Sequence, residues 1–461
     1  MSRFVGDGRA EATDVNALVS VDSHLEAIRA MLPTPEPIEL RLADALGLVL
    51  AEEVVSEVEV PAFANSSMDG YAVVSSDLVD ANDGTPVDLP VAGEVPAGLQ
   101  QVPALRAGTC VRIMTGAPVP DGADAVVPVE TVTAGGTDAE RAGDAGGAVD
   151  AGRTAEAARA GDAGRAGDAG GAGRIEAASV VRFHRSVASG MFVRQPGEDL
   201  QVGQALLAAG RRLTAADVAV LAAAGRTRVR CVPPPRVVIV VSGDELVPAD
   251  VAPGPGQIRD ANGPMLAAMV RAAGGVPFSA GIIADDHKAL SYAFDTNLGH
   301  ADVFVCTGGA SAGTRDLLPD VIGALGEAES VKVAMKPGMP QIRGSIAGRP
   351  VIGLPGNPVS AFVSFETFVR PAIRALQGRR DVDRPTVVAT ADEELHSPPA
   401  KRGYVRVRLS RDASGWHASP TGHQGSHVVS SIARADGLAV IPEDVTRIGA
   451  GESVRVQLLV E

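Results

Sequence analysis

Short runs of apolar residues alternate with helical patterns in the stretch from Arg236 to Gly378. The apolar runs are RVVIVV, AGII, DVFVC and PVIGL, and the helical patterns begin near Asn262, His287, Arg315 and Pro358. Strands that are apolar on both faces and are separated by helices are typical of a parallel sheet with helices on both sides. The pattern therefore predicts a doubly wound α/β domain, which is the candidate catalytic domain.

Shorter β patterns lie on either side of this stretch. Many turn residues between Pro61 and Val129 separate β-rich pieces such as CVRIM at Cys110–Met114 and AVVPVE at Ala125–Glu130, which predicts a small, largely β domain. After the α/β stretch, YVRVRLS at Tyr404–Ser410 and SVRVQLLV at Ser453–Val460 alternate with a period of two residues. They predict a C-terminal β domain.

A helix is expected near the N-terminus. Ser23 and Glu26 stand at the spacing of a capping box, in which the two side chains satisfy free N–H groups of the first helical turn. Leu25, Ile28 and Leu32 fall on one helical face. The pattern predicts a helix that is capped by Ser23 and buries this face.

Composition sets one segment apart and limits the class of partner. Residues 133–174 consist almost entirely of Ala, Gly, Asp, Arg and Glu, so we expect a disordered insertion within the β-rich domain. The 461 residues suffice for about two to four domains. The net charge of −15 argues against nucleic acid or an anionic membrane as a partner.

The cysteines and the apolar runs indicate a cellular compartment. Cys110, Cys231 and Cys306 are too few and too widely spaced for a disulfide framework, so they are expected to be reduced core residues. No run approaches the roughly 18 apolar residues of a membrane span, and no signal-peptide pattern is present. A cytoplasmic protein without membrane contact is expected.

Polar residues follow each apolar run of the predicted sheet, at the edge where such sheets bind ligands. The segments are Ser242–Glu245, Ala284–Asp286, Thr307–Gly313 with Asp316 beyond it, and Pro355–Pro358. Glycines between a strand and a helix let backbone N–H groups approach an anion, so TGGASAG indicates phosphate binding. The alternative is a structural turn, because the segment matches neither the P-loop nor the dinucleotide-binding pattern.

Two sets of charged residues belong to the same region. Glu245, Asp285 and Asp316 follow different strands, and beside an anion-binding loop they predict a Mg²⁺ site. The alternative is that they are solvated or helix-capping carboxylates. Lys332 and Lys336 would face one side of an extended segment and bind a small oxyanion, unless they are solvated lysines on an exposed strand.

A series of motifs in one order resembles the MoeA-type molybdenum insertases, a family that includes the E domain of gephyrin. The motifs are PAFANSSMDGYAV at Pro61–Val73, RIMTGAPVPDGADAVVPVE at Arg112–Glu130, RQPGEDL at Arg194–Leu200, SGDEL at Ser242–Leu246, TGGASAG with Asp316, AMKPGMP at Ala334–Pro340, LPGNPVSA at Leu354–Ala361 and TGHQGSH at Thr421–His427. The resemblance spans most of the chain. TGG and LPG alone are less specific, because the related molybdopterin adenylyltransferases share that α/β domain.

The resemblance implies a fold of four parts and an activity. The parts are an elongated linker domain from residues 15–60 and 193–235, a β-rich domain at 61–192, the α/β molybdopterin-binding domain at 236–378 and a C-terminal β-barrel at 379–461. The implied enzyme is a molybdopterin molybdenumtransferase that inserts molybdate into adenylylated molybdopterin, with Mg²⁺-dependent release of AMP. A homodimer with a shared active-site cleft is implied, as is transient contact with molybdopterin adenylyltransferase and molybdoenzymes.

Roles for individual residues follow from their positions in the motifs. Catalytic roles are implied for Asp69, Thr115, Asp199, Asp285, Asp316, Lys332 and Lys336. Substrate-binding residues are expected to be Gly308, Gly309, Ser311, Gly313, Pro355, Gly356, Pro358 and Ser426. Metal ligands are expected to be Glu245, Asp285 and Asp316. Pro355-Gly356-Asn357-Pro358 would then form a rigid wall beside the glycine loop, although Pro358 also suits a plain turn into a helix.

Several alternatives stay open at this point. Asp69 and Thr115 also suit ordinary turn and cap positions. Met339 stands where some family members have a lysine, so no third cation is assigned to that loop. His423 and His427 lack the further ligands of a zinc site. The rival functions are a molybdopterin adenylyltransferase and a gephyrin-like scaffold protein.

Overall fold

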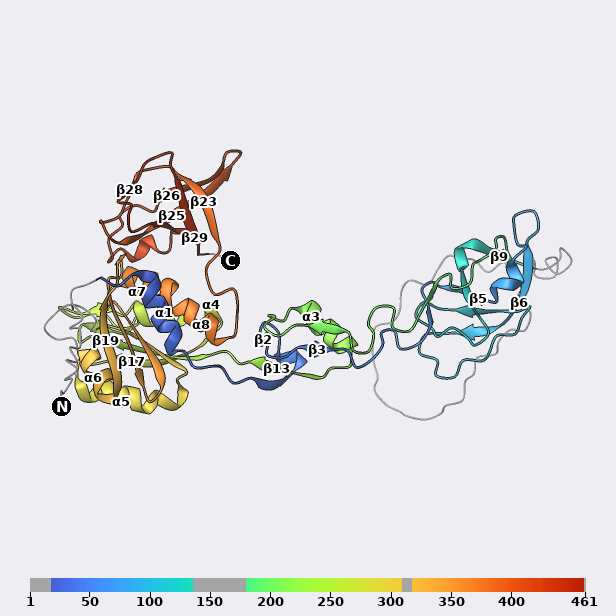
Figure 1. The fold of residues 1–461 in the computed structure, drawn as a ribbon, viewed down its shortest axis with the longest axis horizontal. Helices are drawn as coiled ribbons and strands as arrows, with labels where there is room; N and C mark the ends of the chain where they lie inside the picture. The colour runs from blue at the N-terminus through green and yellow to red at the C-terminus, as the bar shows by residue number, and fades with distance from the viewer. Residues whose placement is uncertain (1–17, 136–179, 309–316, 460–461) are drawn as a thin grey trace, which may run out of the picture. The chain divides into compact units, whose positions relative to one another are not determined.

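The computed structural model describes residues 18–135, 180–308 and 317–459 (Figure 1). The chain forms two compact units. The first comprises residues 1–53, 207–218 and 227–461, and the second comprises residues 54–206 and 219–226. The second unit is therefore an insertion in the sequence of the first.

A six-stranded sheet forms the centre of the α/β domain in the first unit. Its strand order is β17-β14-β18-β22-β21-β19, and the first four strands run parallel. These are β17 (Val276–Ile283), β14 (Arg236–Ser242), β18 (Val303–Thr307) and β22 (Arg349–Leu354). Each contains one of the four apolar runs, so the predicted parallel sheet is confirmed. The antiparallel pair β21 (Pro340–Ile346) and β19 (Gly326–Lys332) at one edge was not predicted.

Helices cover both faces of this sheet (Figure 1). They are α4 (Asn262–Ala273), α5 (His287–Asn297), α6 (Leu317–Leu325), α7 (Pro358–Ser364) and α8 (Arg370–Leu376). The π-helical turn η5 (Phe365–Val369) joins α7 to α8. One apolar core contains side chains of α4, α7, η5 and α8, and a second contains side chains of α5 and α6. The predicted helix starts at Asn262, His287 and Pro358 are confirmed.

The N-terminal helix α1 (Val21–Met31) exists, but its predicted cap is wrong. Ser20 is the cap: its backbone is extended and its side-chain oxygen accepts a hydrogen bond from the N–H of Ser23, which lies inside the first turn. The helix starts earlier because Val19 forms a β-bridge to Val333, which fixes the chain just before Ser20. The buried side chains are accordingly Val21, His24 and Ile28, whereas Leu25 and Leu32 are only partly buried.

A closed β-barrel forms the C-terminal region, as predicted. Its strands are β23 (Thr386–Ala391), β25 (Arg402–Asp412), β26 (Gly415–Pro420), β27 (Gly437–Ile441) and β29 (Ser453–Leu458). Pairing of β25 with both β26 and β27 closes the ring. The short strand β20 (Met335–Lys336), which follows β19, pairs with β25. A segment from the α/β domain is therefore built into the barrel sheet.

The second unit is β-rich, as predicted. Its six-stranded sheet has the order β8-β5-β7-β6-β10-β9. The strands are β5 (Gly70–Val73), β6 (Val87–Val95), β7 (Cys110–Ile113), β8 (Ala125–Pro128), β9 (Val132–Ala134) and β10 (Val180–Phe183). Thr133 and Ala134 belong to β9, so the predicted insertion at 133–174 starts too early by these residues. Residues 136–179 lie outside the described part of the chain.

Smaller elements connect the two units in sequence. β1 (Ile38–Arg41), β2 (Val49–Leu50) and β13 (Arg228–Val232) form a three-stranded sheet, so segments from both expected parts of the linker domain pair with one another. The helix α3 (Ala215–Ala223) precedes β13.

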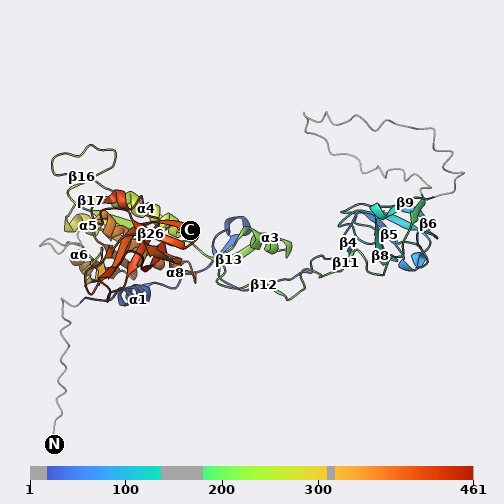
Figure 2. The ribbon, with the colours of Figure 1, turned by 90° about the horizontal axis from the view of Figure 1, so that it is seen from above.

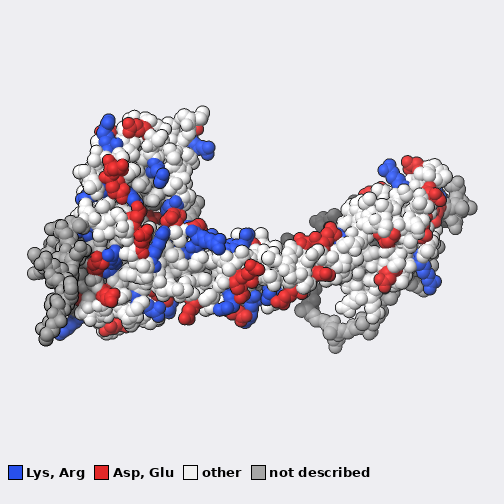
Figure 3. Space-filling view, in the orientation of Figure 1, with Lys and Arg blue, Asp and Glu red and all other residues white. Residues whose placement is uncertain are grey.

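The cysteines lie in the core, and charged side chains of both signs lie on the surface (Figure 3). The three cysteines are free and buried. Acidic and basic side chains are intermixed on the face shown in Figure 3. None of the described helices is long and apolar enough to cross a membrane.

The buried imidazole of His24 links folding to pH. Helix α1 lies beside α8 (Figures 1 and 2), and the His24 ring packs edge-on against Phe368 at 4.7 Å between centroids. Burial, with a smaller contribution from the Arg343 charge, lowers the pKa of His24 to about 4. The unfolded chain therefore takes up a proton near pH 6.5 that the folded chain takes up only near pH 4.

We predict that folding loses stability through His24 as the pH falls from about 6.5 to about 4, by roughly 3 kcal/mol in total. The His24→Leu variant should lack this part of the pH dependence, whereas His287→Leu, at an exposed position, should retain it. Urea unfolding followed by the fluorescence of Trp416, the single tryptophan, measures the first unit. Equal pH profiles for wild type and His24→Leu would contradict the prediction.

Candidate active site

A cavity of about 420 Å³ opens at the carboxyl ends of the parallel strands. Each strand contributes to its wall through the residues that follow it. Lining residues that were predicted from the sequence are Glu245, Asp285, Gly308, Pro355, Gly356 and Pro358. The edge that the strand pattern indicated thus carries a hollow into which four separate loops converge.

Some predicted residues have no described position. Gly309, Ser311, Gly313 and Asp316 lie outside the described residues. The glycine loop is therefore represented by its first members, Thr307 and Gly308.

Gly308 is held tightly against strand β14. Its φ is +93°, in the left-handed region, and a Cβ atom at this position would lie 2.0 Å from the carbonyl oxygen of Ser242. Real Cβ atoms essentially never approach an oxygen so closely, so only glycine satisfies both the conformation and the space. The close approach brings the ends of β14 and β18 together at the floor of the cavity.

A buried amide that sequence analysis missed ties the cavity wall together. Asn262, the first residue of α4, is 7% exposed and its Nδ2 donates to Gly356 O at 2.7 Å and to Thr307 Oγ1 at 3.1 Å. Thr307 Oγ1 in turn donates to Pro355 O at 3.1 Å. The network fixes the Pro-Gly-Asn-Pro block to the neighbouring strand, so this block is a braced wall as well as a turn.

Two polar atoms on this wall have no hydrogen-bond partner among the described residues. They are Asn262 Oδ1 and Ser242 Oγ, and Ser242 is only 2% exposed. A buried polar atom without a partner costs free energy, which a bound ligand recovers by supplying the missing hydrogen bond. An asparagine that starts a helix after a loop was the available signal in the sequence, but it reads equally well as an ordinary cap.

The acidic residues of the cavity have different surroundings. Glu245 and Asp285 are exposed and line the cavity. Asp260 also lines it, but its Oδ1 accepts the N–H of Gly263 at 2.9 Å and so serves the start of α4. Within the described ranges, no group of three or more His, Cys, Asp or Glu side chains is placed to bind a metal ion. Glu245 and Asp285 therefore supply two hard oxygen donors and not a complete coordination shell. Arg259, a cation that sequence analysis did not select, also faces this cavity.

The lysine segment differs from its prediction as one extended strand. Lys332 ends β19 and Lys336 ends β20, and both are exposed, but the three residues between them are all buried. The alternation breaks because Val333 pairs with Val19 while Met335 pairs with the barrel strand β25. Neither lysine lines the cavity.

The barrel reaches the site through the loop that contains Ser426. The backbone O of Ser426 accepts the N–H of Val359 at 3.2 Å, in the first turn of α7. Arg406, fully buried, supports this loop: its guanidinium donates to Gly425 O at 3.3 Å and to His423 O at 3.4 Å. Burial lowers the pKa of Arg406 to about 10. Ser426 thus lies next to the Pro-Gly-Asn-Pro wall and contacts α7 through its main chain.

Asp69 and Thr115 meet within the second unit. Both the N–H and the Oγ1 of Thr115 donate to Asp69 Oδ1, at 2.7 and 2.8 Å. These bonds lower the pKa of Asp69, the backbone bond contributing most. The pair is exposed, and so is Asp199 in the same unit. The alternative interpretation, in which Asp69 and Thr115 are ordinary turn and cap residues, therefore accounts for these hydrogen bonds. The carboxylate of Asp69 is nevertheless exposed to solvent.

Exposed apolar side chains accompany this pair. Met68 and Met114, the sequence neighbours of Asp69 and Thr115, are exposed. Phe192 is also exposed and has a positive φ of 56°. Its carbonyl oxygen accepts from both the N–H and the Oγ of Ser67, at 2.9 and 3.2 Å, which holds the unusual backbone in place. Strained residues of this kind concentrate at functional sites.

Comparison with known proteins shows that three regions of this chain match known protein families. The region described as "MoeA N-terminal region (domain I and II)" matches residues 19–225, "Probable molybdopterin binding domain" matches residues 238–375, and "MoeA C-terminal region (domain IV)" matches residues 388–459. The protein "Molybdopterin molybdenumtransferase 2" of Mycobacterium tuberculosis is 37% identical over 443 residues, covering 95% of this chain and 98% of the relative. "Molybdopterin molybdenumtransferase 1" of the same organism is 35% identical, covering 96% and 99%.

A solved structure has a similar fold. The crystal structure of the molybdopterin biosynthesis moea protein from Pyrococcus horikosii has a TM-score of 0.76 and 30% identity, covering 96% of this chain and 99% of that one. The cavity falls inside the region that matches the probable molybdopterin binding domain.

We predict that Gly308→Ala destabilises the first unit by at least ~2 kcal/mol, because the new methyl group meets a backbone oxygen at a position with positive φ. Gly356→Ala is the matched control, since its nearest neighbours would lie 3.6 Å from the new Cβ and its φ is not in the left-handed region. Urea unfolding followed by Trp416 fluorescence measures both variants. Similar urea midpoints for Gly308→Ala and Gly356→Ala would contradict the prediction, because they would show that the ends of β14 and β18 can move apart to accept a methyl group.

Proposed function

The chain belongs to the MoeA family of molybdopterin molybdenumtransferases, and from this premise we propose that it inserts molybdenum into molybdopterin during molybdenum cofactor biosynthesis. The observation that carries the proposal is the cavity at the strand ends, with its braced wall and two buried polar atoms that have no hydrogen-bond partner in the described part of the chain. The family regions that match on both sides of the α/β domain favour this activity over that of an adenylyltransferase built from the α/β domain alone.

The substrate proposed for the cavity is adenylylated molybdopterin. Gly308 begins the loop whose backbone N–H groups would hold phosphate, and Asn262 Oδ1 would accept a hydrogen bond from the ligand. The wall from Pro355 to Pro358 would limit where the ligand lies. Lys332 and Lys336 are proposed to attract molybdate from outside the cavity, since two ammonium groups favour a doubly charged oxyanion.

Mg²⁺ is the proposed cofactor. Glu245 and Asp285 are the described residues that would hold it, because their carboxylate oxygens suit a hard cation and both face the cavity. When bound, Mg²⁺ would neutralise negative charge that develops as the phosphoanhydride is cleaved and AMP is released. Asp316 is proposed as a further ligand from the sequence alone.

A homodimer with a shared active-site cleft is also part of the proposal. Asp69 and Thr115 belong to a different compact unit from the cavity, and Met68, Met114 and Phe192 leave apolar surface exposed beside them. A partner subunit that covered this surface would bring a carboxylate to the cleft and remove apolar area from water. A cytoplasmic location and transient contacts with a molybdopterin adenylyltransferase and molybdoenzymes complete the proposal.

The scaffold alternative makes a different prediction for purified protein. A scaffold would bind its partners without consuming adenylylated molybdopterin, and an adenylyltransferase would form that compound from molybdopterin and ATP. The proposed enzyme should release AMP from it only when molybdate is present. AMP measured with and without molybdate separates the three functions.

The carboxylates and the lysines should fail in different ways. Asp285→Ala should raise the Mg²⁺ concentration required for AMP release, because one hard-cation donor is lost. Lys332→Ala and Lys336→Ala should raise the molybdate concentration for half-maximal rate by about tenfold each, equivalent to ~1.4 kcal/mol of lost attraction. Initial rates of AMP release in separate titrations of the two ions provide the measurement. Lysine variants with wild-type molybdate dependence would contradict the oxyanion assignment.

Complementation tests the shared cleft. At a Mg²⁺ concentration too low to support Asp285→Ala, the Asp69→Ala and Asp285→Ala proteins should each show little activity, and a mixture allowed to exchange subunits should regain about a quarter to a half of wild-type activity, because one intact site forms in each heterodimer. Subunit exchange is verified by mass spectrometry of differently tagged chains. Confirmed exchange without recovered activity would show that each site is built within one chain.

A further inference from the structure

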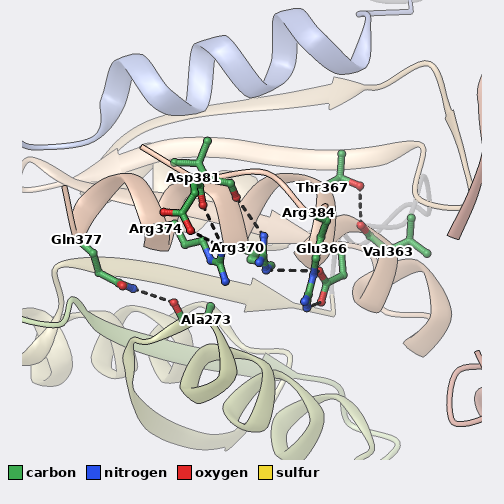
Figure 4. Close-up of polar contacts among 10 residues, drawn as sticks. Ala273, Val363, Glu366, Thr367, Arg370, Arg374, Gln377, Asp381 and Arg384 are labelled. Carbon is green, nitrogen blue, oxygen red and sulfur yellow. Dashed lines mark hydrogen bonds and ion pairs between the residues drawn. The ribbon is translucent and has the colours of Figure 1, made fainter. Parts of the chain in front are cut away.

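A buried charge cluster connects the α/β domain to the barrel, away from the cavity. Glu366 lies in the π-helical turn η5, and its side chain is 5% exposed. Arg384 lies two residues before the first barrel strand, β23. Its guanidinium donates to both carboxylate oxygens of Glu366, from Nε at 2.8 Å and from Nη2 at 3.1 Å. Figure 4 shows the two side chains pointing toward one another. The bond joins the helix of one domain to the chain entering the other.

Neighbouring arginines hold the same connecting segment. Arg370 lies with Nε 3.9 Å from Glu366, and its Nη1 donates to the carbonyl oxygen of Val382 at 3.1 Å. Arg374 donates to the carbonyl oxygen of Asp381 at 3.0 Å. Both arginines are almost fully buried. The segment between α8 and β23 is therefore fixed to the helix at successive points.

The helix that carries this cluster also carries the cavity wall at its other end. Pro358 begins α7, which continues through η5 into α8. The C-terminal part of the chain contacts this continuous helix at separate points. Ser426 O accepts the N–H of Val359 at the start, Arg384 bonds Glu366 further along, and Tyr404 of β25 bonds Thr367 next to it. Together with the pairing of β20 with β25 and the bond between Asp22 and Arg402, these separated contacts restrict the orientation of the barrel.

The chemistry of the cluster favours a role in positioning. A buried ion pair generally contributes little stability compared with apolar residues of similar size, because both charges must be desolvated. Its directional, two-pronged bonding instead fixes geometry. The π-helical turn supports this, since such turns are frequent at functional sites.

We propose that the Glu366–Arg384 pair is a positioning clamp that holds the barrel loop with Ser426 against the substrate cavity. Loosening the clamp would let the barrel tilt and would withdraw the Ser426 carbonyl from the first turn of α7. The wall from Pro355 to Pro358 would then lose its outer support, and substrate would bind less tightly while the reacting groups remain in place. The effect on substrate rests on the proposed function; the effect on the barrel does not.

Two variants of Arg384 and one matched control test the clamp. Arg384→Met removes the bond, and Arg384→Lys keeps the charge but loses the two-pronged geometry. Arg379→Met is the control, because Arg379 pairs with Asp381 inside the connecting segment, from Nε at 3.0 Å, and not across to the helix. Trp416 fluorescence and circular dichroism establish that each variant is folded.

Hydrogen exchange of the Val359 amide gives a readout that is independent of activity. We expect exchange to become about tenfold faster in Arg384→Met, less so in Arg384→Lys, and to stay at the wild-type rate in Arg379→Met. The KM for adenylylated molybdopterin should rise about fivefold in Arg384→Met with kcat within about twofold of wild type, as expected when an interaction common to ground and transition states is lost.

Each outcome decides a separate statement. Equal Val359 exchange in Arg384→Met and Arg379→Met would overturn the clamp. Faster exchange with an unchanged KM would overturn its role in substrate binding. A wild-type protein that releases no AMP would contradict the proposed function, and the exchange measurement would still decide whether the clamp holds the barrel.

Discussion

The close approach of Gly308 to the carbonyl oxygen of Ser242 is the constraint on which the site depends. It brings the ends of two central parallel strands so near that no side chain separates them. Residues that follow each of the four parallel strands line the cavity beyond this point. Asn262 joins the end of β18 to the loop after β22 by bonding Thr307 and Gly356. The cavity thus lies beside strand ends that pack closely, and polar groups brace its wall.

The barrel completes this arrangement from outside the α/β domain. Strand β20 passes from the sheet into the barrel, and the Ser426 carbonyl meets the first turn of α7. Buried Arg406 holds the loop between these contacts by donating to main-chain oxygens. Its Nε also donates to Ser431 Oγ at 3.0 Å, so one side-chain hydroxyl holds the guanidinium in addition to the carbonyl groups. The loop that contains Ser426 is thereby tied to β25, the strand that carries Arg406.

The local sequence pattern predicted most of the helices and strands of the α/β domain. The features that it did not predict depend on contacts between residues far apart in the sequence. The four parallel strands and the helix starts at Asn262, His287 and Pro358 follow from period and turn chemistry. The cap of α1 could not be predicted, because it depends on a bridge from Val19 to Val333 far along the chain. Similarly, the alternation from Lys332 to Lys336 breaks where neighbouring residues join two different sheets. Asn262 reads as a cap until its partners, which lie 45 and 94 residues further along the chain, are known.

The early position of helix α1 in the sequence affects the order in which parts of the chain can fold during synthesis. Asp22 on this helix bonds Arg402 of the barrel across a sequence separation of 380 residues. At about 5–20 residues per second, a ribosome needs roughly 20–80 s to supply that partner. The core that receives Val21 and Ile28 consists largely of residues 237–376, so their apolar face stays uncovered until the α/β domain has been synthesised, when the inserted second unit is already complete in sequence. Helix α1, the first helix in the described part of the chain, therefore docks long after its own synthesis, and its apolar face is a natural target for chaperones during translation.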